Sequence, residues 1–129
     1  MKVSARRTEG YAHALTARDH TLTADEPESA GGTDTGPNPQ ELMALSLASC
    51  TAITVEMYAG RKEWELGAVE VEVDYESDGP GRGRFEVLVK IPEPLSAEQQ
   101  ERLEVIAGKC PVHRILTGEV EISDRIEAG

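Results

Sequence analysis

The chain has 129 residues, a formal net charge of −11 at pH 7 and a pI near 4.7. This is the usual length of one domain, and we predict a single domain over residues 1–129. The acidic balance argues against DNA, RNA and anionic membranes as partners, because all of these require a basic protein surface. Residues 1–7 are partly basic but no apolar segment follows them, so the sequence predicts a cytoplasmic protein.

Short strands are predicted at the beginning of the chain. Residues 3–7 and 11–17 form the two strands of a hairpin, and after a second turn at residues 18–20, Leu22 begins a short third strand. Residues 25–39 are rich in Gly, Pro, Asp and Thr, which is typical of a loop. A connection of about fifteen residues without secondary structure is usually functional or mobile in a compact domain.

A long helix is predicted after this loop. Asn38 is a good N-cap, Pro39 suits the first helical position, and Glu41 favours the positive end of the helix dipole. Residues 42–59 then contain a single charged side chain, Glu56. Several Ser and Thr residues make this run a poor bilayer segment. We therefore expect a helix that is apolar nearly all round and buried in the centre of the domain.

A second hairpin and further helices are predicted in the last half of the chain. Residues 69–75 and 85–91 alternate between apolar and polar side chains on either side of a glycine-rich turn. A capping box at residues 96–99 begins a helix, and Pro111 begins a shorter one. Val120 and Ile122 are expected in a last strand. Strands segregated from helices in this order predict an α+β fold.

The chain has only two cysteines, Cys50 and Cys110. Two are too few for a secreted disulfide scaffold, so redox chemistry is a candidate role, since a thiolate attacks peroxides and disulfides. Cys50 shares a helix face with Ser46 and Thr54, which places its thiol in a partly polar stripe. A free cysteine is also commonly a small buried hydrophobe, and that structural reading competes with the reactive one.

Local sequence favours Cys110 as the more reactive thiol. It precedes Pro111 and so occupies the N-cap of the next helix, where the helix end stabilises a thiolate. A purely structural capping role is the alternative. Cys110 and His113 could together bind a metal, but two ligands without a second pair are a weak zinc signal. We therefore predict no metal and no bound cofactor.

Two motifs resemble those of the OsmC/Ohr family. The first comprises residues 36–42 (Gly-Pro-Asn-Pro-Gln-Glu-Leu), Ala44 and residues 47–51 (Leu-Ala-Ser-Cys-Thr), and the second comprises residues 110–114 (Cys-Pro-Val-His-Arg). Their separation of about sixty residues fits the family, as do the hairpin and the capped helix between them. The residues around both cysteines are most similar to the YhfA-like subgroup.

The resemblance implies an intertwined homodimer with an OsmC-like fold and two sites at the interface. It also implies reduction of organic hydroperoxides by two cysteines, with Cys50 as the peroxidatic residue and Cys110 as the resolving one. This assignment opposes the local argument for Cys110, and we follow the resemblance, because a resolving thiol must also be able to leave and exchange. The family further implies an external dithiol reductant, such as a lipoyl carrier.

The family pairs the peroxidatic thiol with an arginine and a glutamate. Arg18 resembles the arginine of the Arg-Asp turn in Ohr proteins and is the candidate to stabilise the thiolate, with two arginines at positions 6 and 7 as weaker alternatives. Position 40 holds Gln, and Glu41 is the candidate carboxylate. Nine helical residues span about 13 Å and half a turn, so Glu41 cannot touch Cys50 of its own helix. It would act across the dimer or by orienting an arginine.

These observations predict a thiol-dependent peroxidase that reduces organic hydroperoxides through a sulfenic acid and then a disulfide. The alternative is a non-catalytic dimeric binding or stress-accessory protein on the same scaffold, with both cysteines structural or weakly reactive. Under this alternative, Arg18 is a solvated arginine in a turn, and Glu41 is a residue at the helix N-terminus that the helix dipole favours.

Overall fold

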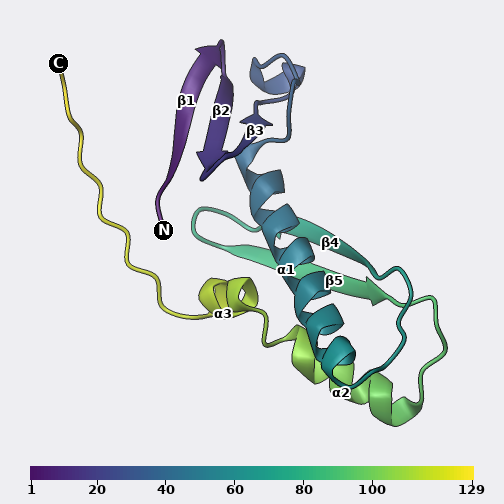
Figure 1. Cartoon of the computed structure of the whole chain (residues 1–129). Coiled ribbons are helices and arrows are strands. Elements are labelled where there is room, and N and C mark those ends of the chain that lie inside the picture. Colours follow the sequence, from purple (N-terminus) through teal and green to yellow (C-terminus); the bar gives the residue numbers. More distant parts are fainter. The chain divides into compact units, whose positions relative to one another are not determined.

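The computed structural model describes residues 1–129, which fall into two compact units, Met1–Leu45 and Ser46–Gly129. Figure 1 labels the elements along the chain. Three strands come first, followed by a long helix, a two-stranded hairpin and two further helices. The predicted α+β class is confirmed. Both sheets are antiparallel, and the helices lie between the two sheets or after them in the sequence.

The first unit contains a three-stranded antiparallel sheet with the order β1-β2-β3. Its strands are β1 (Val3–Glu9), β2 (Ala12–Ala17) and β3 (His20–Ala24). The β2–β3 turn places Arg18 in the left-handed region with φ 54°. A non-glycine residue seldom adopts this conformation, which is consistent with a tight turn of two residues. The three predicted strands are therefore confirmed.

The loop after β3 is organised around the buried carboxylate of Asp25. This side chain is 2% exposed and accepts hydrogen bonds from the hydroxyls of Thr35 and Thr33, at 2.7 and 2.8 Å, and from both of their backbone N–H groups. A short 3-10 helix, η1 (Glu28–Ala30), lies in the same loop. The hydrogen bonds from Thr35 and Thr33 hold the pKa of Asp25 far below its ordinary value.

The long helix α1 (Pro39–Arg61) begins where the sequence predicts. Asn38 Oδ1 accepts from the Glu41 backbone N–H at 2.8 Å, and the Glu41 carboxylate accepts from the Asn38 N–H at 2.9 Å. This reciprocal pair satisfies two N–H groups that the first turn of a helix leaves without partners. The predicted helix start is confirmed, and Glu41 has a defined capping role.

The expectation that α1 is buried nearly all round is wrong for the single chain. Only one stripe is buried, made of residues spaced by four: Leu47, Thr51, Val55 and Ala59. On another face the apolar side chains of Leu45, Ile53 and Met57 are 54%, 51% and 61% exposed. The other elements of the chain are too few and too short to cover a helix of 23 residues on all sides.

By length and composition alone, α1 is apolar enough to cross a membrane. The core helix of a soluble protein meets the same criterion. Because one stripe of α1 packs into the core of the chain, this property does not argue for a membrane segment.

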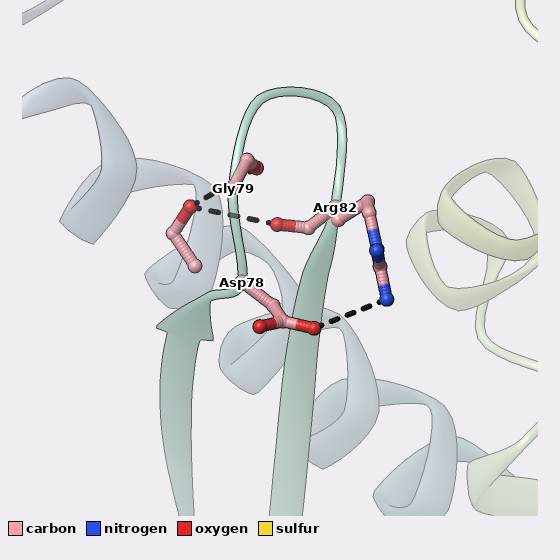
Figure 2. Close-up of polar contacts among 4 residues, drawn as sticks. Asp78, Gly79 and Arg82 are labelled. Carbon is pink, nitrogen blue, oxygen red and sulfur yellow. Dashed lines mark hydrogen bonds and ion pairs between the residues drawn. The ribbon is translucent and has the colours of Figure 1, made fainter.

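The second unit contains the predicted hairpin, β4 (Glu70–Ser77) and β5 (Gly83–Lys90). Figure 2 shows its turn, where Asp78 and Arg82 form an ion pair at 3.2 Å. The Ser77 hydroxyl lies 3.4 Å from the carbonyl oxygen of Gly79. Gly79 has φ 113°, a conformation that favours glycine.

Two helices complete the second unit, α2 (Ala97–Ala107) and α3 (Pro111–Thr117). The predicted capping box of α2 is present, with Ser96 and Gln99 bonded reciprocally. Side chains from α1, the following linker and α2 form the core cluster of this unit, which comprises Val55, Ala59, Leu66 and Leu103. This cluster fixes α2, and through it the N-terminus of α3, relative to α1.

The predicted last strand is absent. Residues 119–129 form no helix or strand, and Val120 and Ile122 are 57% and 81% exposed. The alternating pattern there is compatible with a strand, but neither sheet of the chain pairs with it. A strand requires a hydrogen-bonding neighbour, which local sequence does not supply.

Candidate functional site

The second unit brings the two cysteines together. Cys50 lies in the middle of α1, and Cys110 is the N-cap residue of α3. The Cys50 thiol lies near enough to the Cys110 thiol to raise its pKa, although the two residues are sixty positions apart. Both cysteines are free thiols in this structure. The α1–α2 core and the short link to α3 therefore bring the two thiols close together.

The Cys110 thiol is enclosed by protein. Its side chain is fully buried, and Sγ accepts a hydrogen bond from the His113 backbone N–H at 3.2 Å. The Thr51 hydroxyl lies 3.9 Å from the same sulfur and is also bonded to the Leu47 carbonyl at 2.8 Å. The predicted N-cap role of Cys110 is thus confirmed, with Pro111 at the start of the helix.

Burial raises the pKa of the Cys110 thiol above its ordinary value. The hydrogen bond from the His113 N–H and that from Thr51 lower it, whereas the neighbouring Cys50 raises it further. Burial therefore opposes the stabilisation of a Cys110 thiolate that its N-cap position predicts. A thiolate buried among apolar groups loses more hydration than the end of a two-turn helix restores.

Cys50 is more accessible than its partner. It is half-buried. Of its predicted neighbours on the polar stripe, Ser46 is exposed and Thr54 is half-buried. Thr51, the next residue along the chain, is 2% exposed. An attacking reagent can therefore reach Cys50, while Cys110 lies behind it in the core.

Arg18 and Glu41 belong to the first unit, residues 1–45, and the two cysteines to the second. Arg18 is exposed in the β2–β3 turn. Glu41 lies nine residues before Cys50 on the same helix, and its carboxylate is bonded to the Asn38 backbone. Within one helix these nine positions separate Glu41 from Cys50 by about 13 Å.

Thr51 contributes to the site without having been predicted, and His113, considered above only as a possible metal ligand, contributes through its backbone N–H. Thr51 follows Cys50 directly and belongs to the buried stripe of α1, so helical periodicity could have placed it toward the core. His113 acts on Cys110 through its backbone, which carries no sequence signal beyond the predicted N-cap. No group of three or more His, Cys, Asp or Glu side chains is placed to hold a metal ion.

A cavity of about 690 Å³ lies beside the Cys110 thiol. Thr51 and Val55 of α1, strand β5, α2 and His113 contribute to its wall. Cys110 itself does not line the cavity, but Thr51 and His113 line it and also contact Cys110 Sγ, His113 through its backbone N–H. The site thus combines an accessible thiol, a buried thiol and an adjoining cavity.

Comparison with known proteins identifies the fold and the family. An OsmC-like protein from Mycoplasma pneumoniae is 20% identical, with a TM-score of 0.76 over 91% of this chain and 86% of that one. The organic hydroperoxide resistance protein OsmC from Legionella pneumophila is 22% identical, with a TM-score of 0.65 over 92% and 90%. Organic hydroperoxide resistance protein OhrB of Bacillus subtilis is 28% identical, with a TM-score of 0.62 over 93% and 92%.

A search of curated proteins gives no match. The family profile of OsmC-like proteins matches residues 32–123, which include both cysteines, the hairpin and the last two helices. That span covers well over half of the chain, and the structural neighbours share its fold along nearly their whole length. The chain therefore belongs to the family of OsmC-like proteins.

Proposed function

We propose that this protein is a thiol-dependent peroxidase that reduces organic hydroperoxides to alcohols. The observation that carries the proposal is the pairing of the half-buried thiol of Cys50 with the fully buried thiol of Cys110. An accessible thiol can meet a peroxide, and a second thiol beside it can capture the oxidised product. Two solved structures of the same fold are named as organic hydroperoxide resistance proteins, which supports this reaction class.

The proposed reaction has three steps. The Cys50 thiolate attacks the terminal oxygen of the hydroperoxide, the O–O bond breaks, and an alcohol leaves with a proton while Cys50 becomes a sulfenic acid. The Cys110 thiol then attacks that sulfur, forming a Cys50–Cys110 disulfide and releasing water. An external dithiol reduces the disulfide by two exchange steps and leaves as its own disulfide. The lipoyl group of a carrier protein is the proposed dithiol.

The raised pKa of Cys110 suits the resolving role. A resolving cysteine that stays protonated is a poor target for peroxide, so Cys50 alone is oxidised first. It ionises when it attacks the sulfenic acid, helped by the N–H of His113 and the hydroxyl of Thr51. The burial of Cys110 thereby ensures that Cys50 is oxidised before Cys110 reacts.

Arg18 and Glu41 complete the proposal. A guanidinium beside Cys50 would favour its thiolate, and the exposed Arg18 side chain is free of ion pairs in the first unit. Glu41, bonded to the Asn38 backbone, is proposed to orient an arginine or to act on the thiol of a partner subunit. Action on the thiol of a partner subunit requires a homodimer, which the exposed apolar face of α1 supports. We further propose that this dimer is cytoplasmic.

Thiol counting tests the proposal. The reduced protein is treated with one equivalent of cumene hydroperoxide, and free thiols per chain are measured before and after. We expect two thiols to be lost and one equivalent of cumyl alcohol to appear, and dihydrolipoamide should then restore both thiols. A Cys50→Ser/Cys110→Ser variant controls for peroxide consumed elsewhere, such as at the three methionines.

The burial of Cys110 also supports a second candidate, a non-catalytic binding or stress-accessory protein on the same scaffold. Buried cysteines commonly act as small hydrophobes, and Cys110 additionally caps a helix. Under this alternative, neither thiol is lost when cumene hydroperoxide is added. That result would transfer the assignment from peroxidase to binding protein.

A further inference from the structure

We propose that Thr51 is a further catalytic residue, whose hydroxyl switches its hydrogen bond to the sulfur of Cys110 while this sulfur attacks the Cys50 sulfenic acid. The inference rests on the proposed function and deepens it, since it assigns a switching group to the second step of the reaction. All of the residues concerned lie in the second unit of the chain, residues 46–129.

Thr51 is the one polar side chain in the buried stripe of α1. The other members of that stripe, at intervals of four residues, are Leu47, Val55 and Ala59. A buried hydroxyl requires a hydrogen-bond partner, and a threonine that bonds the carbonyl four residues earlier slightly destabilises a helix. Valine has nearly the same shape and would fill this position without that requirement. Packing alone therefore does not account for the hydroxyl.

The Thr51 hydroxyl has one proton and lies between two acceptors. Its oxygen is 2.8 Å from the carbonyl oxygen of Leu47 and 3.9 Å from Sγ of Cys110. A carbonyl oxygen is a better acceptor than a neutral thiol, so in the reduced protein the proton is donated to Leu47. A thiolate reverses this order, because a hydrogen bond to a charged acceptor is about twice as strong as one between neutral groups. Rotation about the Cβ–Oγ1 bond then turns the proton toward the sulfur.

This rotation leaves no buried polar group without a partner. The Leu47 carbonyl keeps the helical hydrogen bond from the backbone N–H of Thr51 itself. The sulfur gains a donor at a place that water does not reach, since Cys110 is 0% exposed. Its other donor is the backbone N–H of His113 at 3.2 Å. Donors from two helices, α1 and α3, thus converge on one buried sulfur.

The resolving step is the step that uses this contact. Cys110 Sγ forms a bond to the sulfur of Cys50, the S–O bond of the sulfenic acid breaks, and the Cys110 proton leaves with the oxygen as water. Negative charge develops on Cys110 Sγ as its proton departs, and the Thr51 hydroxyl stabilises that charge. The attack on the peroxide takes place at Cys50 instead. Loss of the hydroxyl should therefore slow resolution alone, which leaves the sulfenic acid open to a second peroxide and to over-oxidation to a sulfinic acid.

Thr51→Val and Thr51→Ser test the inference in a single turnover. Reduced protein is mixed with one equivalent of cumene hydroperoxide and stopped in acid at successive times, and mass spectrometry gives the fractions of sulfenic acid and disulfide. We expect Thr51→Val to consume peroxide at the unmodified rate but to form the disulfide on the order of tenfold more slowly, as for the loss of one hydrogen bond to a charged group. With excess peroxide, its yield of sulfinic acid per turnover should rise by a similar factor. Thr51→Ser keeps the hydroxyl and should resolve at nearly the unmodified rate.

Thr117→Val is the matched control. The Thr117 hydroxyl also bonds the carbonyl four residues earlier, that of His113, at 2.9 Å, but this residue is exposed at the end of α3. The change removes the same kind of bond from the helix that Cys110 caps, and both rates should stay as they are. Resolution at the unmodified rate in Thr51→Val would overturn the inference. Equal slowing in Thr51→Ser or in Thr117→Val would also overturn it, because altered packing would then be the cause.

The pKa of Cys110 separates this inference from the proposed function. It is measured from the ultraviolet absorbance of the thiolate in Cys50→Ser protein, which lacks the titratable group that acts on Cys110, with Cys50→Ser/Cys110→Ser as the blank for tyrosine ionisation. In that background we expect Thr51→Val to lower the thiolate fraction at a given pH on the order of tenfold, because the thiolate loses a donor, and Thr51→Ser to leave it nearly unaltered. An unchanged pKa in Thr51→Val overturns the inference whether or not peroxide is consumed. A raised pKa in a protein that consumes no hydroperoxide would overturn the proposed function and leave the contact between hydroxyl and sulfur standing.

Discussion

The backbone N–H of His113 donates to Sγ of Cys110 at 3.2 Å, so a cysteine side chain caps helix α3. The same sulfur is fully buried and adjoins the thiol of Cys50. One atom therefore serves the start of a helix and the proposed disulfide. If the disulfide forms as proposed, this double role would link the redox state of the site to the local structure of α3.

The two thiols should differ in their pH dependence of alkylation. Iodoacetamide reacts with thiolates, and burial raises the pKa of Cys110 above the ordinary 9.0. We expect Cys110, measured in Cys50→Ser, to be alkylated more slowly than Cys50 in Cys110→Ser, with its rate still rising above pH 9. Urea-unfolded protein is the control, in which both thiols should react alike. Faster alkylation of Cys110 in the folded protein would contradict the assigned pKa direction.

Oxidation should loosen the first turn of α3. To form a disulfide, Cys110 Sγ must turn toward Cys50 and give up its alignment with the His113 N–H. We expect hydrogen exchange at the His113 amide to accelerate in oxidised protein by about five- to tenfold, the equivalent of about 1 kcal/mol for a lost cap. The Gln99 amide, capped by Ser96 on α2, is the internal control and should not change. Equal exchange at His113 in both redox states would argue against this link.

The Asp25 carboxylate should stabilise the loop of residues 25–37. Its pKa is lowered in the folded protein, so its contribution to stability is present above the ordinary value of 3.8 and is lost as the pH falls below it. Asp25→Asn removes the charge that the two threonines stabilise, and we expect faster proteolysis of this loop at pH 7. Asp34→Asn, at an exposed position with φ 54° that asparagine also tolerates, is the matched control. Identical proteolysis of both variants would contradict the role of Asp25.

The exposed apolar face of α1 should be covered by a second copy of the chain. We expect sedimentation to give about twice the 14.0 kDa chain mass at micromolar concentration, with an interface above about 2,000 Å². Ile53→Asp places a charge on this face and should shift the protein toward monomers. Glu56→Gln, an exposed polar position on the same helix, should leave the mass unaltered. A 14 kDa species for the unmodified protein would refute the homodimer.

The parts of the fold that the sequence predicts correctly are those that local interactions determine. The hairpins at residues 70–90 and 3–17 follow from alternation and turn residues, the start of α1 follows from the N-cap Asn38, and that of α2 follows from a capping box. The strand expected at Val120 and Ile122 is absent, because its formation depends on a neighbouring strand. Membership of the YhfA-like subgroup and the single-domain organisation stay predictions.

The candidate site was predictable only in part. Motif spacing identified Cys50 and Cys110, and Pro111 correctly predicted that Cys110 is an N-cap. The same local reasoning cannot register how deeply the folded chain buries Cys110, and this burial raises the pKa of its thiol. The residues that bury Cys110 include Thr51, which is about sixty positions away in the sequence. Only the folded chain brings Thr51 to the Cys110 sulfur.

The central claim is that Cys50 receives the oxygen and Cys110 resolves the product, and single-turnover peroxide consumption by the two serine variants tests it most directly. We predict that Cys50→Ser consumes no cumene hydroperoxide. Cys110→Ser should consume about one equivalent and retain a sulfenic acid that dimedone labels at Cys50, since no second thiol can condense with it. Consumption by Cys50→Ser together with an inactive Cys110→Ser would reverse the roles and contradict the account.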